Sequence, residues 1–185
     1  ESVAREALAD AGFEAVGLDH FARPDDDMAI AARSKALNRN FQGYTTDRAT
    51  VLIGLGASSI GQFPEGFVQN DPDIGRWRRA IEAGHLATAK GKALDADDRV
   101  RAAIIATIMC DYEINLAAAL EPFGLTPADF ATEMTALEPL IADGIATVSG
   151  AMIKVTPFGR PFVRLVAAAF DAYLARAAAR HSVAV

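Results

Sequence analysis

The chain has 185 residues, of which 51% are hydrophobic and 23% are charged, a composition typical of globular rather than disordered proteins. Its formal net charge of −6 disfavours nucleic acid as a partner, because an acidic surface repels phosphate backbones. No run of about 18 apolar residues predicts a membrane span, and the charged N-terminal stretch lacks the hydrophobic core of a signal peptide. These features predict a cytoplasmic protein that binds neither nucleic acid nor membrane.

Residues 1–70 alternate short helical and strand-like segments that are joined by glycines. Gly12 ends the first helix. Pro24 precedes the second helix, and three aspartates lie at its N-terminal end, where the helix dipole is positive. In chain order the pattern predicts a helix over 2–11, a strand over 13–17, a helix over 25–37 and a strand buried on both faces over 50–56 (TVLIGLG). Such an order indicates part of an α/β layer, for example the closing units of a barrel.

Residues 71–185 are predicted to be mostly helical. One helix is expected over 72–83, a second begins at Asp95, and a third covers 126–144. A fourth is expected after Pro157, because apolar residues recur there every four positions, at Phe162, Val166, Phe170 and Leu174. Two β-prone runs, 145–149 and 151–155, flank Gly150 and predict a hairpin. Helices followed by a hairpin and a further helix are typical of a winged-helix-like arrangement.

The sequence therefore predicts an α+β fold with two parts. Residues 1–70 would form the last strand and helix units of a partial barrel, and residues 71–185 a winged-helix-like C-terminal domain. Barrel strands without neighbours expose backbone edges and apolar faces, which favours swapping or dimerisation of the chain on its own.

The densest polar segment covers residues 38–46 (NRNFQGYTT). Loops carry function where a rigid scaffold positions them, and this loop directly precedes the expected buried strand. A solvated turn, in which Asn and Gly supply unusual backbone angles, explains the same residues. Composition alone leaves the two interpretations open.

A glycine-rich segment, residues 54–61 (GLGASSIG), follows the expected strand. Glycines at a strand end let a ligand approach the backbone, and barrel enzymes place their sites at the C-terminal ends of strands. No lysine follows and no helix clearly begins there, so the segment is not a phosphate-loop or dinucleotide signature. On this motif alone, a tight turn is the favoured interpretation.

Three further features have structural as well as functional interpretations. Asp19 and His20 could shuttle a proton, or the histidine could be hydrogen-bonded to a neighbouring loop. The single cysteine, Cys110, lies among apolar residues at helical spacing, which favours a buried core residue; alone it cannot hold zinc or an iron–sulfur cluster. The arginines around Trp77 favour a solvated helix face over an anion site.

Several strings resemble the oxygen-independent coproporphyrinogen III oxidase family. They are GLDHFARPDDDMAIAARSKALNRNFQGYTT, LIGLGASSIG and FVQN in this order, and later VTPFGRPFVRLVAAAFDAYL, which is similar to the helix that ends the family's chains. The resemblance covers essentially the whole chain and is strongest from Gly17 to Asn70. Haem chaperones of the same superfamily carry a different loop in place of NRNFQGYTT, so a fragment of such a chaperone is the alternative.

The resemblance implies a radical S-adenosylmethionine enzyme whose N-terminal barrel holds a 4Fe-4S cluster on a CxxxCxxC motif. It further implies two bound S-adenosylmethionine molecules and a 5′-deoxyadenosyl radical that abstracts hydrogen from a propionate. The reaction would convert coproporphyrinogen III into protoporphyrinogen IX in haem synthesis, by oxidative decarboxylation of two propionates to vinyl groups without oxygen. The complete enzyme is expected to be a cytoplasmic monomer.

Carried over by position, the resemblance implies that Phe41 and Gln42 form an active-site pair and that Ile60 contacts the second S-adenosylmethionine. Phe41 would shield the radical from water, and Gln42 would hydrogen-bond a polar group. An apolar side chain at Ile60 suits an adenosyl or methionyl group. Asp19 and His20 match the family's string without an assigned role.

No CxxxCxxC motif occurs in the chain, and the residues for the first S-adenosylmethionine are missing with it. We therefore expect no metal ligands here and predict that the 185-residue chain alone is catalytically inactive. A winged-helix DNA-binding regulator is a third hypothesis. Residues 126–144 contain no Lys or Arg, however, and a recognition helix needs such residues to contact phosphates and bases.

Overall fold

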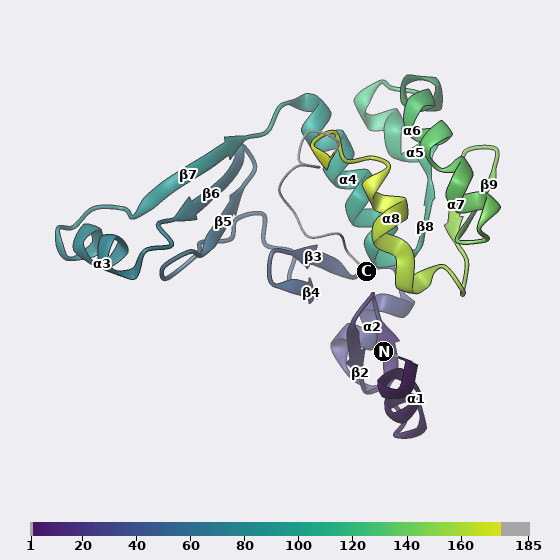
Figure 1. The fold of residues 1–185 in the computed structure, drawn as a ribbon, viewed down its shortest axis with the longest axis horizontal. Coiled ribbons are helices and arrows are strands. Elements are labelled where there is room, and N and C mark those ends of the chain that lie inside the picture. Colours follow the sequence, from purple (N-terminus) through teal and green to yellow (C-terminus); the bar gives the residue numbers. More distant parts are fainter. Residues whose placement is uncertain (1, 175–185) are drawn as a thin grey trace. The chain divides into compact units, whose positions relative to one another are not determined.

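The contacts of the chain form two compact units in a computed structural model that describes residues 2–174 (Figure 1). Unit 1 consists of Glu1–Thr46 and Val100–Val185, and unit 2 consists of Asp47–Arg99. These two units are defined by which residues contact one another, and they are not the two family domains predicted from the sequence. The boundary predicted at residue 70 concerns the family's domains and stays a prediction. Within the described part of the chain, no helix combines the length and the apolar character needed to cross a bilayer.

The N-terminal part of unit 1 is built from short hairpins and helices. Its described elements are α1 (Ser2–Asp10), β1 (Glu14–Val16), β2 (His20–Ala22), α2 (Asp27–Arg33), β3 (Asn38–Asn40) and β4 (Gly43–Thr45). β1 pairs antiparallel with β2, and β3 with β4. Gly12 ends α1 with a φ of +83°, and the Asp26 carboxylate caps α2 by accepting from the Met28 N–H at 2.8 Å. The first two predicted helices and the first strand are confirmed, with α2 shorter than predicted.

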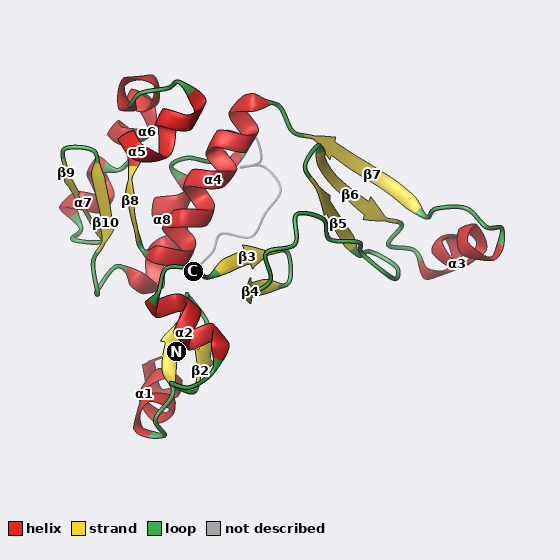
Figure 2. Cartoon of the chain, turned by 180° about the vertical axis from the view of Figure 1, so that it is seen from behind, coloured by secondary structure: helices red, strands yellow, loops and turns green. Residues whose placement is uncertain are grey.

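The C-terminal part of unit 1 combines helices with a small sheet. The elements here are α4 (Ala96–Asp111), which begins in unit 2, then β8 (Glu113–Asn115), α5 (Leu116–Leu120), η1 (Glu121–Phe123), η2 (Pro127–Phe130), α6 (Ala131–Ala136), α7 (Glu138–Ala142), β9 (Ala146–Ser149), β10 (Met152–Val155), η3 (Arg160–Phe162) and α8 (Val163–Ala168). The sheet has the antiparallel order β8–β10–β9 (Figure 2). Asp95 caps α4 by accepting from the Asp98 N–H at 2.8 Å, and Gly150 turns the β9–β10 hairpin with a φ of +58°. Both features were predicted from the sequence.

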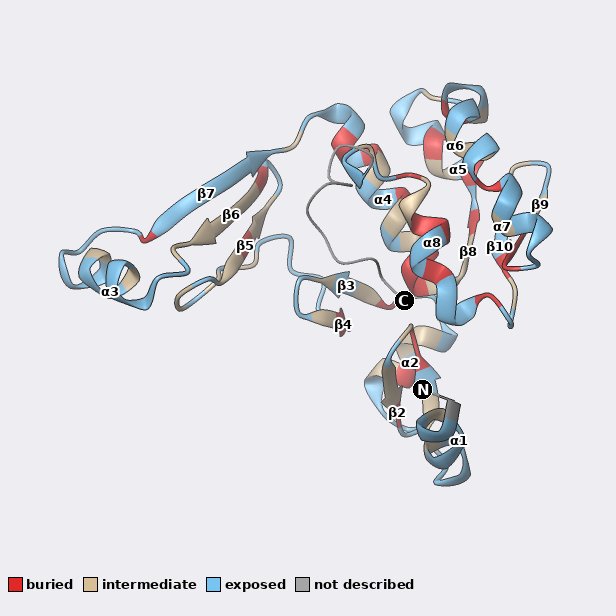
Figure 3. Ribbon diagram, viewed as in Figure 1, coloured by how far each residue is buried: buried red, intermediate tan, exposed pale blue. Residues whose placement is uncertain are grey.

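Buried apolar residues of α4, α5, α8 and the sheet form the main core of unit 1 (Figure 3). Ile104 and Ile108 of α4 meet Leu116, Leu137 and Phe170, and each of the five is at most 1% exposed. Burying one such side chain contributes about 1.5–3 kcal/mol, so this cluster dominates the stability of the unit. The apolar face predicted for α4 is therefore its core face.

Unit 2 is an antiparallel sheet with one inserted helix. Its elements are β5 (Ile60–Phe63), β6 (Gly66–Asn70), α3 (Ile74–Glu82) and β7 (Thr88–Ala93), and the strand order is β5–β6–β7. β7 is exposed along its whole length, and α3 has no buried residue. Ala87 is the one buried hydrophobic residue between positions 47 and 99, all of which the structure describes. Unit 2 therefore has a much smaller core than unit 1.

Residues 50–56 do not form the buried strand that their apolar run predicts. Leu52 makes an isolated antiparallel bridge with Gln62, while Ile53 and Leu55 are 69% and 88% exposed. A strand is buried on both faces only when it has neighbouring strands and a covering layer on each side. Among the described residues, this segment has one β-bridge and no neighbouring strand on its other side. The prediction of a strand over 50–56 that is buried on both faces was therefore wrong.

Two predicted helices are shorter than their sequence patterns suggest. Residues 126–144 form η2, α6 and α7 instead of one helix, because Pro139 has no N–H to continue the hydrogen-bond ladder across the junction at Leu137. The last predicted helix ends as α8 at Ala168, and Phe170 N–H bonds to the Ala167 carbonyl in a tighter turn. Phe170 is still completely buried.

Leu116→Ala tests this core. Leu116 is fully buried, so its truncation removes transferred apolar surface and leaves a cavity. We expect the free energy of unfolding, measured with urea, to fall by about 2–5 kcal/mol. Leu165→Ala is the matched control, because Leu165 lies on α8 and is 46% exposed. Equal losses in the two variants would contradict the placement of the core.

Candidate functional site

Phe41 and Gln42 form the two-residue tip of the β3–β4 hairpin. Asn40 pairs with Gly43 across the hairpin, and the Asn40 side-chain oxygen accepts from the Gln42 backbone N–H at 2.8 Å. This local bond fixes the turn. Gly43 has a φ of +132°, and a Cβ at this position would lie 3.0 Å from Nε2 of His20. Both tip side chains are exposed, Phe41 by 52%, so they can contact a ligand.

One buried tyrosine anchors this hairpin. The Tyr44 hydroxyl accepts from the Leu18 N–H at 3.1 Å and donates to the Met109 carbonyl at 3.0 Å. Its ring lies against Gly17, where any Cβ would overlap the ring. Burial raises the pKa of Tyr44, so the hydroxyl stays protonated and able to donate. Tyr44 therefore connects the hairpin to the loop after β1 and to the last turn of α4.

Asp19 and His20 lie next to the same hairpin. The His20 Nδ1 is 2.9 Å from the Asp19 carboxylate, and the His20 and Tyr44 rings meet edge to face with centroids 5.2 Å apart. The structure thus brings Asp19 and His20 to the hairpin that carries Phe41 and Gln42. A carboxylate on one ring nitrogen orients an imidazole and leaves the other nitrogen for a second partner. Both the proton-shuttle and the structural interpretation of His20 remain consistent with this geometry.

Ile60 begins β5 in unit 2, directly after the glycine-rich loop, and is half-buried. A Cβ on Gly54 would lie 2.9 Å from the carbonyl carbon of Ile60, so this glycine is needed for loop packing. Gly56 has a φ of +101°, and a Cβ there would meet no atom within 4 Å. The Gly56 backbone is therefore open on its Cβ side, where a ligand can approach it.

Asn70 holds the glycine-rich loop in shape. Its Nδ2 lies 3.2 Å from the Gly54 carbonyl, 3.0 Å from the Gly56 carbonyl and 3.1 Å from the Ser59 hydroxyl. Its backbone N–H also donates to the Ser59 carbonyl at 3.0 Å. One amide group therefore satisfies several loop acceptors at once, and the loop enters β5 at Ile60 in a fixed conformation.

The described residues do not supply a metal centre. Among residues 2–174, no three His, Cys, Asp or Glu side chains are grouped so as to hold a metal ion. Cys110, the single cysteine of the chain, is buried, and burial raises the pKa of its thiol to about 11. An iron–sulfur cluster needs several thiolates, so the residues of this chain do not fit one. Cys110 is the core residue that its sequence context favours.

The basic cluster on α3 is a solvated helix face. Arg76 pairs with Asp71 at 2.7 Å, and Arg78 pairs with Glu82 at 2.7 Å. Trp77 is partly buried, and its Nε1 has no hydrogen-bond partner among the described residues. Two of the arginines are therefore balanced by local carboxylates, and the arginines are exposed, in agreement with the solvated helix face favoured from the sequence.

Phe41 and Gln42 lie together in unit 1, whereas Ile60 lies in unit 2. The sequence did not reveal the parts played by Tyr44 and Asn70. Both lie inside the strings that carry the family resemblance, but their roles depend on partners that are distant in sequence or on backbone carbonyls. No local pattern contains such contacts.

The fold is similar to a solved structure described as "Coproporphyrinogen III oxidase (HemN) from Escherichia coli is a Radical SAM enzyme". The two share 35% sequence identity with a TM-score of 0.88, over 94% of this chain and 40% of that chain. The predicted α+β fold is confirmed, and its likeness is to part of a radical S-adenosylmethionine enzyme.

Residues 94–162 match the family described as the HemN C-terminal domain. An oxygen-independent coproporphyrinogen III oxidase of Bradyrhizobium diazoefficiens is 49% identical over 97% of this chain and 40% of its own length. Its counterpart in Escherichia coli is 37% identical over 90% of this chain and 37% of its own length. The family resemblance predicted from the sequence is confirmed. The chain spans about 40% of the length of these relatives.

Tyr44→Phe tests the anchor of the hairpin. The variant leaves the Leu18 N–H and the Met109 carbonyl without this partner, so we expect the free energy of unfolding to fall by about 2–3 kcal/mol. Tyr112→Phe is the matched control. The Tyr112 hydroxyl has no hydrogen bond to a described residue, so its removal should change stability by less than about 0.5 kcal/mol. Urea unfolding that does not separate the two variants would contradict the anchoring role.

Asn70 variants test the glycine-rich loop. Asn70→Asp keeps the shape of the side chain but turns a carboxylate oxygen toward the Gly54 and Gly56 carbonyls. We expect hydrogen exchange at the Ser58 amide, which bonds to the Asp71 carbonyl, to accelerate at least about tenfold. Asn70→Ala should have a smaller effect, because it removes the donor without adding repulsion. Wild-type exchange rates in Asn70→Asp would show that Asn70 does not hold the loop.

Proposed function

We propose that the protein containing this chain converts coproporphyrinogen III into protoporphyrinogen IX without oxygen. The observation that carries the proposal is the 49% identity, over 97% of the chain, to a relative named oxygen-independent coproporphyrinogen III oxidase. Conservation of identity over both units supports a shared activity more strongly than fold likeness alone, because one fold hosts many functions.

This chain would contribute one side of the site. Gln42 can donate and accept hydrogen bonds at an exposed tip, which suits a carboxylate or a polar cofactor group. Phe41 presents an exposed aromatic face beside it that can cover a reactive group from water. Tyr44 fixes the hairpin that carries both residues, because its buried hydroxyl bonds to the backbone of Leu18 and Met109. In this proposal Phe41 and Gln42 orient and shield the reacting propionate.

Ile60 would contact S-adenosylmethionine. The support is its position at the end of the loop where Gly56 leaves the backbone open, and its half-buried apolar side chain suits an adenosyl or methionyl group. When bound, S-adenosylmethionine with an iron–sulfur cluster would supply the radical chemistry of the reaction. Two S-adenosylmethionine molecules and a cytoplasmic location also belong to the proposal, and both come from the resemblance.

The proposal predicts that Phe41→Ala and Gln42→Ala lower the rate of decarboxylation. We expect a loss of about 10²-fold in kcat/KM for each, because misplacement of a reacting group by about 1 Å has an effect of this size. The assay follows anaerobic conversion of coproporphyrinogen III by the complete gene product. Phe158→Ala is the control, since Phe158 is also an exposed phenylalanine, 66%, on a separate loop.

The same preparation separates the proposal from a haem chaperone. A protein that binds haem stoichiometrically but does not decarboxylate coproporphyrinogen III would overturn the proposed activity. Wild-type rates in Phe41→Ala and Gln42→Ala, with activity present, would overturn the assigned residues and leave the activity itself intact.

A further inference from the structure

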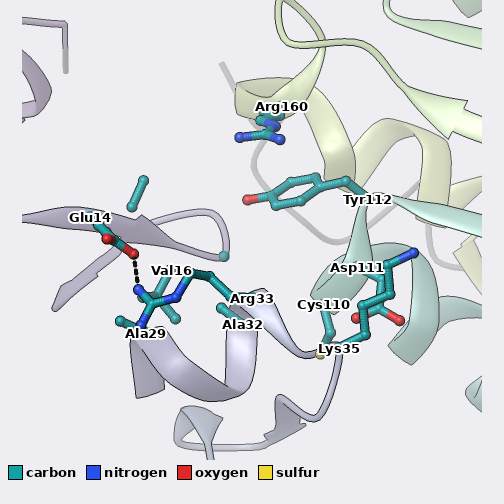
Figure 4. A pocket seen from close by; sticks show the side chains of 12 residues that line it. Glu14, Val16, Ala29, Ala32, Arg33, Lys35, Cys110, Asp111, Tyr112 and Arg160 are labelled. Carbon is teal, nitrogen blue, oxygen red and sulfur yellow. Dashed lines mark hydrogen bonds and ion pairs between the residues drawn. The ribbon is translucent and has the colours of Figure 1, made fainter. Parts of the chain in front are cut away.

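A pocket of about 260 Å³ opens in unit 1, away from the tip of the β3–β4 hairpin. Its walls come from β1, α2, the last turn of α4 and the start of η3 (Figure 4). Its charged lining residues are Arg33, Lys35, Arg160, Glu14 and Asp111. Cations therefore outnumber carboxylates in a pocket of a chain whose net charge is negative.

Two of these cations already have partners. Arg33 forms an ion pair with Glu14 and donates to the Pro24 carbonyl. Lys35 forms an ion pair with Glu113, which also accepts from Lys154 at 3.0 Å. Arg33 is paired with a carboxylate within the fold, and Lys35 shares Glu113 with Lys154, so carboxylates of the chain already hold both side chains in place.

Arg160 is different. Its guanidinium lies over the ring of Tyr112, 5.0 Å from the ring centroid, and pairs with no carboxylate among residues 2–174. It is also exposed, so an incoming ligand can reach it. Figure 4 shows the guanidinium next to the Tyr112 ring, with no ion pair drawn to it. Stacking on an aromatic face favours a fixed orientation of a guanidinium and leaves its N–H groups free to donate at the edge. The Arg160 guanidinium is therefore a cation of the pocket that has no carboxylate partner among the described residues.

Tyr112 presents a second unused donor. Its hydroxyl makes no hydrogen bond to any described residue, and its hydroxyl end points toward the β1 side of the pocket (Figure 4). Burial raises the pKa of Tyr112 to about 12, against the opposing effect of Arg160 and Arg5, so at neutral pH it remains an O–H donor. The backbone of Tyr112 has a φ of +59°, a left-handed conformation that is costly for a non-glycine residue. Such strain is concentrated at functional sites.

We propose that this pocket binds a carboxylate group, held by the Arg160 guanidinium and the Tyr112 hydroxyl. A guanidinium matches the planar, two-oxygen geometry of a carboxylate, and a neutral phenol adds one short donor bond. The volume lies below the roughly 300–1,000 Å³ of typical ligand pockets, which suits a carboxylate on a short chain rather than a whole tetrapyrrole. The proposal does not depend on the proposed function.

The negative charge of Asp111 would repel an anion bound in the pocket, and its surroundings weaken this repulsion. The positive charge of Lys35 acts on Asp111 and partly offsets its negative charge, while burial raises the pKa of this carboxyl. Figure 4 shows Asp111 beside Lys35, with the Tyr112 ring between it and Arg160. The Arg160 end of the pocket therefore keeps its positive character.

Two sources can supply the carboxylate, a free short-chain acid or a carboxylate arm of a larger molecule. Both are tested by calorimetric titration of the complete gene product, first with propionate and then with coproporphyrin III as a competitor that carries propionate arms. Arg160→Gln removes the charge, and Tyr112→Phe removes only the hydroxyl. Arg164→Gln is the matched control, because Arg164 is an exposed arginine four residues further on that does not line the pocket.

We expect saturable propionate binding that weakens at least about tenfold in Arg160→Gln and about fivefold in Tyr112→Phe, and that is unchanged in Arg164→Gln. Competition by coproporphyrin III that is lost in Arg160→Gln assigns the pocket to a carboxylate arm. Propionate binding without such competition assigns it to a free acid. Tyr112→Phe decides the question if Arg160→Gln does not fold.

The proposal is overturned if the wild-type protein shows no saturable propionate binding. It is also overturned if Arg160→Gln and Tyr112→Phe bind as tightly as the wild type, or if Arg164→Gln weakens binding equally. Tighter binding of inorganic phosphate than of propionate, lost in the same variants, would overturn the carboxylate assignment, because the site would then prefer a tetrahedral anion.

Discussion

The buried hydroxyl of Tyr44 joins three segments of unit 1 that are distant in sequence. It accepts from the backbone of Leu18, donates to the backbone of Met109 and belongs itself to β4. A two-stranded hairpin with three residues in each strand is at most marginally stable alone, so β3–β4 depends on contacts outside the hairpin. Because both partners are backbone groups, the bond fixes the position of the main chain itself. The glycine at position 17 makes room for the ring and completes this fit.

The role proposed for the hairpin tip requires fixed side-chain positions, and this anchor supplies them. Phe41 and Gln42 are exposed at its tip, where side chains can meet a ligand, while Tyr44 in β4 is buried. Exposure and precise placement usually conflict, since exposed turns are mobile. Tyr44 resolves the conflict by holding the turn from its buried side, and the Asn40 side chain fixes the turn itself. In unit 2, Asn70 has the equivalent part for the loop that leads to Ile60.

Local patterns in the sequence predicted what depends on near neighbours. The helix starting after Asp95, the hairpin around Gly150 and the buried state of Cys110 all follow from spacing, caps and apolar context. The run over residues 50–56 was misread, because burial of a strand is decided by neighbours that the run itself cannot specify. The family came from long strings such as NRNFQGYTT. The site's supports, Tyr44 and Asn70, depend on distant or backbone partners and became visible only in the fold.

Hydrogen exchange at the Leu18 amide tests the central role of Tyr44 most directly, because this N–H donates to the Tyr44 hydroxyl. The Leu18 amide and the amides of the β3–β4 pairing should be protected in the wild-type protein. In Tyr44→Phe they should exchange faster together, by about 10–100-fold, while the core amides of α4 change less. Unchanged exchange at Leu18 and in the hairpin of Tyr44→Phe would contradict the view that this hydroxyl holds the hairpin in place.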